Sequence, residues 1–314
     1  MGQRLEHRVA IVTGAGRGIG RSVAKLLAEE GASVIVNDLG GSVEGASSSV
    51  SPADAVVSEI REDGGTAFAN YDSVAEFGSA GKIVEMALEE FGRVDILCNA
   101  AGILRDRMVF NMSPEEWEAV IRVHLLGSFN VTRQALPYMV DQNYGRVVLF
   151  SSISALGSPG QSNYSAAKEG VVGLARSLAV ELGDYNISVN AVYPGGSTRM
   201  VASIPDSARE WLREQAQKSP GSYPVADLVA SPEPEEALVP ESNAAKIVYL
   251  CTEVGGAING EVIGTHGWSM SRYFRRFPTK SVYKGEGQWT LEEIESVAPV
   301  SLAVGLVNPA PREE

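Results

Sequence analysis

The sequence is poor in cysteine and histidine. Of its 314 residues only Cys98 and Cys251 are cysteines, so a disulfide framework is excluded and a reducing compartment is favoured. The three histidines, His7, His124 and His266, are scattered along the chain. Because neither the HExxH nor the CxxC spacing occurs, we expect no bound metal.

Positive charge and long apolar runs are also scarce. Lys and Arg number 26 against 39 Asp and Glu, which gives a formal net charge of −13. This balance argues against nucleic acid or an anionic membrane as a partner, because both require a basic field. No apolar run approaches the ~18 residues that span a membrane. The N-terminus lacks an apolar signal region and the last residues are not Ser-Lys-Leu, so we expect a cytoplasmic protein.

Short apolar runs alternate with longer segments of helical periodicity. The runs carry Val, Ile and Leu at consecutive positions, which is typical of strands covered on both faces by helices. Their alternation with helices predicts an α/β fold with a doubly wound parallel sheet of the Rossmann type. The expected strands are residues 8–13, 32–38, 94–99, 146–151 and 187–192.

Three segments interrupt this alternation. Residues 40–51 are rich in Gly and Ser and are expected to form a loop, and residues 219–240 contain five prolines that exclude a long helix. The regular pattern ends near residue 267, and residues 268–314 are too few for an independent core. We therefore expect one domain, residues 1–267, followed by a C-terminal extension.

A glycine-rich turn, residues 13–20, follows the first expected strand and opens the first expected helix. Glycines let the backbone approach a pyrophosphate, and the helix N-terminus supplies amide donors. Asp38, at the end of the second strand, can accept both ribose hydroxyls and would repel a 2′-phosphate, which favours NAD over NADP. The alternative for Asp38 is a solvated strand end. The cofactor-binding residues expected in the turn are Gly14, Arg17, Gly18, Ile19 and Gly20.

Tyr164, Lys168 and Ser151 form a candidate catalytic group. Tyr164 and Lys168 are four residues apart on an expected helix, so both side chains lie on one face. A phenol with a reference pKa of ~10 is a poor base at neutral pH, but an adjacent ammonium favours the phenolate. Ser151, at the end of a strand, lies where open α/β sheets bind ligands and can hold a substrate oxygen beside Tyr164.

Together these motifs resemble those of the short-chain dehydrogenase/reductase family over residues 5–267. The turn has the TGxxxGxG spacing, and Ser151 precedes the Tyr-x-x-x-Lys pair by thirteen residues. Asn99-Ala100-Ala101-Gly102 and Pro194-Gly195 match the family as well. Because several independent spacings agree, the resemblance is specific, and it implies an oxidoreductase that interconverts a secondary alcohol and a ketone.

The resemblance implies further cofactor contacts. Asp72 would receive the adenine amino group with Val74 beside the ring, and Asn99 would lie along the cofactor ribose. Lys168 would hold the nicotinamide ribose as well as act on Tyr164. The additional cofactor-binding residues implied in this way are Asp72, Ser73, Val74, Asn99, Tyr164, Lys168, Pro194 and Gly195.

One position departs from the family pattern. His124 stands where many members carry an Asn that shapes a helix kink and completes a proton relay. An imidazole could join a water chain, because it both donates and accepts hydrogen bonds. The alternative is a buried histidine that pairs with a backbone carbonyl. Both interpretations stay open at this point.

Longer phrases are similar to the (3R)-hydroxyacyl-CoA dehydrogenase branch of the family, among them residues 36–41, 69–74 and 102–108. This similarity implies a fatty or steroid-derived 3-hydroxyacyl-CoA as substrate and a substrate lid at about residues 196–240. The alternatives are a free steroid, terpene or other alcohol as substrate, or a catalytically silent NAD-binding protein. By the same resemblance we expect a homodimer or homotetramer.

The C-terminal extension concentrates basic and aromatic residues between positions 272 and 284. Arg272, Arg275, Arg276, Lys280 and Lys284 could bind the phosphates of a CoA thioester, or the segment could pack on a partner subunit. Further on, the spacing of a threonine and a glutamate at positions 290 and 293 predicts a capped final helix.

Overall fold

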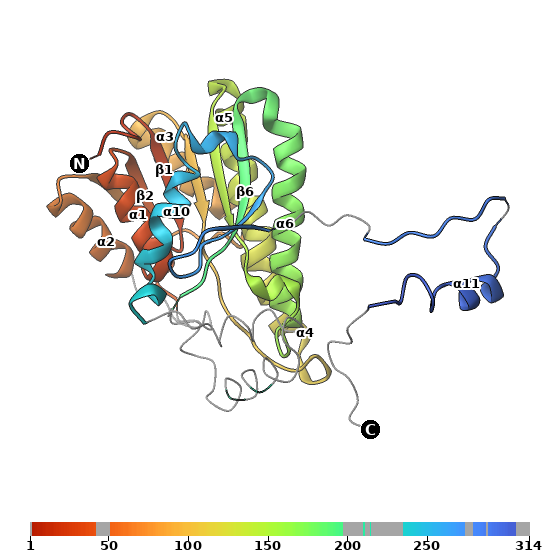
Figure 1. Ribbon diagram of the computed structural model, residues 1–314. Coiled ribbons are helices and arrows are strands. Elements are labelled where there is room, and N and C mark those ends of the chain that lie inside the picture. The colour runs from red at the N-terminus through yellow and green to blue at the C-terminus, as the bar shows by residue number, and fades with distance from the viewer. Residues whose placement is uncertain are drawn as a thin grey trace.

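The computed structural model describes residues 2–41, 51–196, 235–273, 279–286 and 288–305, together with residues 210 and 214 (Figure 1). Its centre is an eight-stranded sheet with the strand order β3-β2-β1-β4-β5-β6-β7-β8. Strands β1 to β7 pair in parallel and β8 pairs antiparallel to β7. The doubly wound parallel sheet expected from the sequence is confirmed.

The strands coincide closely with the apolar runs of the sequence. Strands β1, β2, β4, β5 and β6 have a mainly buried side-chain pattern, as expected for strands covered on both faces, whereas β3, at the edge of the sheet, is partly exposed. Strand β8 lies in the predicted C-terminal extension, so the sheet continues beyond residue 267. The bounds are β1 Val9–Thr13, β2 Ser33–Asn37, β3 Thr66–Asn70, β4 Ile96–Asn99, β5 Gly145–Phe150, β6 Ile187–Tyr193, β7 Val262–Gly264 and β8 Ser271–Tyr273.

Helices cover the sheet on both sides (Figure 1). Residues of α1, α2 and α10 form one buried apolar cluster with one face of the sheet, and residues of α3, α5 and α6 form a second cluster on the other face. The α-helices are α1 Gly18–Glu29, α2 Ser51–Glu62, α3 Phe77–Phe91, α4 Pro114–Ile121, α5 Gly127–Gln142, α6 Ser162–Leu182, α10 Glu241–Tyr249 and α11 Leu291–Val297. A π-helical turn, Arg122–Leu126, joins α4 to α5.

Two helices begin with a capping box, in which a side chain and the backbone exchange hydrogen bonds. Ser113 caps α4 by a capping box with Glu116, and Pro114 occupies the first helical position. Thr290 and Glu293 form the same reciprocal bonds at the start of α11, which confirms the capped final helix expected from the sequence. In the part of the chain that the structure describes, no helix has the length and apolar character needed to cross a membrane.

Several predicted segments lie mainly outside the described residues. They are residues 42–50 of the expected glycine- and serine-rich loop, most of the expected lid at residues 196–240, and Arg275 and Arg276 of the extension. Residue 51, the last of the expected loop, begins α2. The boundary between domain and extension stays a prediction.

Candidate active site

The predicted site residues lie at the ends of neighbouring parallel strands. The register places Thr13 at the end of β1 beside Asn37 of β2 and Asn99 of β4, and Asn37 beside Asn70 of β3. The glycine turn, Asp38, Asp72 and Asn99 therefore meet at one edge of the sheet, which is where open α/β sheets bind ligands.

The glycine turn presents bare backbone toward this edge. Gly14 has a φ of +64°, and a Cβ there would lie 2.7 Å from the Cα of Ala101. A Cβ on Gly16 would lie 2.7 Å from Oδ2 of Asp38. Asp38 accepts the Gly16 amide at 2.8 Å and the Gly40 amide at 2.7 Å. A side chain at either position would collide with these neighbours, so the glycines let the turn pack closely at the N-terminus of α1, the kind of helix end that binds phosphate groups.

The adjoining strand ends form a linked set of buried polar groups. The Asn70 side chain donates to one carboxylate oxygen of Asp72 at 3.0 Å, and the Ser79 hydroxyl donates to the other oxygen at 3.3 Å. The Asn99 amide donates to the Ser128 carbonyl and to Thr132, whereas its buried Oδ1 has no hydrogen-bond partner among the described residues. A buried unpaired acceptor is costly, and a ribose hydroxyl at this position would satisfy it.

Tyr164 and Lys168 lie on one face of α6, as predicted. The Lys168 ammonium nitrogen lies 5.4 Å from the centre of the Tyr164 ring and donates to the Phe150 carbonyl at 2.5 Å. Lys168 is 4% exposed. The end of β5 and the first half of α6 are therefore joined through this side chain.

Two serines, Ser151 and Ser152, follow strand β5, and their side chains have different partners. The Ser151 hydroxyl donates to the Lys168 backbone carbonyl at 2.6 Å and is buried. The Ser152 hydroxyl accepts the Ser154 amide at 3.1 Å, and the same side chain opposes the effect of burial on the pKa of Tyr164. The catalytic role of Ser151, expected from the thirteen-residue spacing, stays a prediction, and Ser152 is a second candidate at a spacing of twelve.

Burial dominates the acid–base properties of this group. It raises the pKa of Tyr164 to about 12, an effect that the Ser152 hydrogen bond opposes and the Asp106 charge reinforces. It lowers the pKa of Lys168 to about 7. Lys168 is not among the groups that shift the Tyr164 pKa in this arrangement, in which its ammonium donates to the Phe150 carbonyl. The expected effect of Lys168 on Tyr164 stays a prediction.

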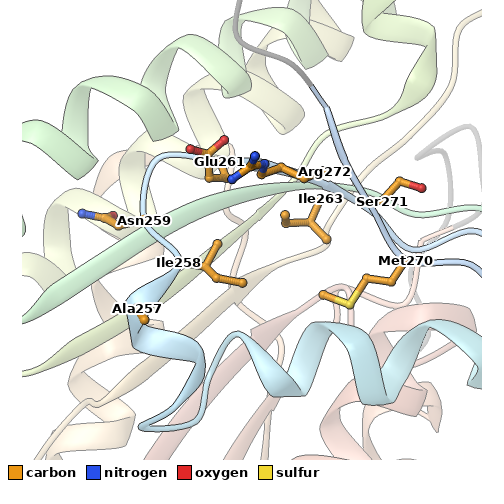
Figure 2. Close-up of a pocket in the computed structure, with 8 residues that line it drawn as sticks. All are labelled: Ala257, Ile258, Asn259, Glu261, Ile263, Met270, Ser271 and Arg272. Atoms are coloured by element: carbon orange, nitrogen blue, oxygen red, sulfur yellow. The ribbon is translucent and has the colours of Figure 1, made fainter.

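A cavity of about 330 Å³ lies elsewhere, along β7 and β8 at the edge of the sheet (Figure 2). None of the predicted catalytic or cofactor-binding residues lines it. The residues that do are Ala257, Ile258, Asn259, Glu261, Ile263, Met270, Ser271 and Arg272.

Comparison with known proteins decides the family. The profile of the short chain dehydrogenase family matches residues 8–209. The chain belongs to the short-chain dehydrogenase/reductase family. As a family member it is an oxidoreductase that acts on CH–OH groups, and the family generally binds NAD or NADP.

Individual relatives agree with this assignment. A short-chain type dehydrogenase/reductase of Mycobacterium tuberculosis is 46% identical over 250 residues, covering 79% of each chain. Peroxisomal multifunctional enzyme type 2 of Mus musculus is 47% identical over 251 residues, which are 80% of this chain and 30% of the mouse enzyme. The crystal structure of a short chain dehydrogenase from Mycobacterium avium superposes with a TM-score of 0.79 at 35% identity, covering 95% of this chain and 96% of that one.

His124 replaces the usual family asparagine inside the π-helical turn. Its Nε2 lies 2.8 Å from the carbonyl oxygen and 3.1 Å from the amide nitrogen of Ile103. The ring meets that of Tyr164 edge to face, with centroids 5.0 Å apart. Burial and the nearby Lys168 charge hold the pKa of His124 well below its usual value. His124 is thus a buried histidine held by a backbone carbonyl, and its Nδ1 has no partner among the described residues.

The buried neutral His124 predicts a pH dependence of stability. Its folded pKa is lowered, so below pH ~6.5 the unfolded chain takes up a proton that the folded chain does not. The free energy of unfolding then falls with decreasing pH by up to about 1.4 kcal/mol per pH unit. In urea unfolding between pH 6.5 and 5, His124→Asn is expected to show a shallower slope than the unmodified protein.

His7→Asn serves as the control, because this histidine is exposed and makes no contact with the site. Its slope should equal that of the unmodified protein. A slope of His124→Asn that also equals it would contradict the assignment of a buried neutral imidazole.

Proposed function

We propose that this protein is an NAD-dependent dehydrogenase that oxidises a secondary alcohol to a ketone, with a 3-hydroxyacyl-CoA as the favoured substrate. The observation that carries the proposal is the grouping of Tyr164, Lys168 and Ser152 at the same edge of the sheet as the glycine turn and Asp38. The buried Asn99 oxygen without a partner among the described residues and the glycine turn at the N-terminus of α1 fit a bound dinucleotide.

The residues divide the chemistry among themselves. Ser152 donates a hydrogen bond to the substrate oxygen and holds it beside Tyr164, which takes the hydroxyl proton as the C–O bond becomes a carbonyl. The bound dinucleotide supplies the hydride acceptor. Lys168, when charged and turned from the Phe150 carbonyl, favours the tyrosinate and reaches the nicotinamide ribose. Ser151 keeps the end of β5 against α6, and this holds Lys168 in place.

The residues of the cofactor site have separate roles in the proposal. Asp38 binds the adenosine ribose hydroxyls and Asp72 the adenine amino group, with Ser73 and Val74 alongside. Asn99 lies along the cofactor ribose. The glycine turn would hold the pyrophosphate, and Pro194 and Gly195 would hold the nicotinamide. The residues of the turn that contact the cofactor are Gly14, Arg17, Gly18, Ile19 and Gly20.

The similarity to peroxisomal multifunctional enzyme type 2 supports the CoA thioester as substrate class. The second candidate is a free steroid, terpene or other alcohol. In the described part of the extension, Lys284 donates to Glu293 and to the Gln288 carbonyl, and Lys280 donates to a carbonyl of the same segment, whereas Arg272 lines the cavity beside β8. A homodimer or homotetramer stays a prediction.

A substrate panel tests the proposed function directly. NADH formation at 340 nm is expected with 3-hydroxyacyl-CoA thioesters, and Tyr164→Phe should retain less than about a tenth of this rate, because a positioned acid–base group contributes ~10²–10⁴-fold. NAD affinity should be unchanged in this variant. Turnover confined to CoA-free alcohols would favour the second candidate, and no turnover of any alcohol would favour a silent binding protein.

The two serines can be separated by substitution. Ser152→Ala is expected to lower kcat by ~10²-fold, since it removes the hydroxyl beside Tyr164. Ser151→Ala should lower kcat less than tenfold but cost ~1 kcal/mol in unfolding free energy, because it removes the buried bond to the Lys168 carbonyl. Steady-state rates and urea unfolding of both variants measure these effects. The reverse order of the two kcat losses would return the catalytic role to Ser151.

Asp38 is expected to enforce the choice of cofactor. With NADP it would lose the ribose hydrogen bonds and face a phosphate, so kcat/KM should favour NAD by at least ~100-fold. Asp38→Ala should narrow this ratio by at least ~10-fold. The matched control is Asp72→Asn, which touches the adenine that both cofactors share and should weaken both equally. Similar kcat/KM values for the two cofactors with the unmodified protein would refute this role.

A further inference from the structure

The side chain of Asn243 contacts Gly195, which belongs to the predicted nicotinamide site. It lies in α10 and is 0% exposed. Its side-chain nitrogen donates to the Gly195 carbonyl at 2.9 Å, and its Oδ1 accepts the Gly195 amide at 3.3 Å. The same Oδ1 accepts the Thr265 hydroxyl at 2.7 Å. One buried amide therefore binds both main-chain polar groups of Gly195 and the first residue after β7.

The surroundings leave Gly195 little freedom to move. A Cβ on Gly195 would lie 2.1 Å from Nδ1 of His266, so the imidazole packs directly against its backbone. One helical turn beyond Asn243, Lys246 donates to the carbonyls of Thr265, Gly267 and Ser269 at 3.0, 2.5 and 2.8 Å. Helix α10 thus fixes the ends of β6 and β7 together.

We propose that Asn243 is a positioning residue for hydride transfer, which holds Gly195 where the nicotinamide ring of the dinucleotide packs. The inference rests on the proposed function, because it takes Pro194 and Gly195 as the nicotinamide side of the site. A primary amide suits this place because it offers a donor and an acceptor in one plane, matching the carbonyl and amide of a single residue. An apolar side chain of the same size would leave three buried polar groups unpaired.

A substitution of Asn243 is expected to affect the two halves of the dinucleotide differently. Movement of Gly195 would disturb the nicotinamide, whereas the adenosine half, bound at the glycine turn and Asp38, would be unaffected. ADP-ribose carries the adenosine half and lacks the nicotinamide, so it serves as an internal reference. A general loss of folding would lower the affinity for ADP-ribose and the affinity for NADH alike.

The test measures three quantities for Asn243→Leu: the dissociation constant of ADP-ribose by calorimetry, the fluorescence of bound NADH, and kcat. We expect ADP-ribose affinity within twofold of the unmodified protein, a shift of bound-NADH fluorescence toward that of free NADH, and a kcat at least tenfold lower. Thr265→Val, which removes only the hydroxyl donated to Asn243, should change kcat and fluorescence in the same direction by a smaller factor.

The matched control is Asn190→Leu. Asn190 is also a buried amide, on β6, but it bonds to the Ile258 carbonyl at 2.6 Å and the Glu261 amide at 3.0 Å rather than to Gly195. Its substitution should leave the NADH fluorescence of the bound state unchanged. The positioning role is overturned if Asn243→Leu and Thr265→Val leave kcat and the fluorescence of bound NADH unchanged. It is also overturned if these variants lower the affinity for ADP-ribose as much as the affinity for NADH. If the unmodified protein binds neither ligand, the proposed function fails, and this inference with it.

Discussion

Burial of the sheet on both faces is the constraint on which the site depends. Most side chains of β1, β2, β4, β5 and β6 are buried, so most polar groups there are found where they have partners or where strands end. The parallel register then aligns those ends. Asn37 of β2 donates to Asn70 of β3 at 2.7 Å and also to the Asp72 carbonyl, which ties the second strand end to the third. The strand ends are thereby held together before any ligand binds.

A second consequence of burial is the reciprocal connection between β5 and α6. The Lys168 side chain donates to the Phe150 carbonyl, and the Ser151 hydroxyl donates to the Lys168 carbonyl. Two side-chain hydrogen bonds of opposite direction thus join the end of β5 to α6. The same burial lowers the Lys168 pKa to about 7 and raises that of Tyr164 to about 12, so ligand contacts can change the protonation of either group. One set of contacts thus serves both the packing and the chemistry.

The features predicted from the sequence were those with a repeating apolar pattern or a fixed spacing between residues. The apolar runs located β1, β2, β4, β5 and β6, and the glycine turn and the Tyr164–Lys168 pair were placed by local patterns. Ser152 became a second candidate only in the structure, because residue counting across a loop does not show the 3₁₀ turn Ile153–Leu156, which the Ser152 side chain caps. Asn243 was missed because a lone asparagine in a helix belongs to no motif. Its role depends on three segments that meet only in the fold.

His124 shows how a local departure from a family pattern is accommodated by its neighbours. A Cβ on Gly102 would lie 2.3 Å from Cε1 of His124, so the imidazole occupies space that only a glycine leaves open. The π-helical turn adds a residue to the helix and directs the ring inward. There it bonds to the backbone of Ile103 and lies edge to face against Tyr164. His124 therefore connects the segment after β4 to Tyr164: it hydrogen-bonds to the Ile103 backbone and packs against the Tyr164 ring.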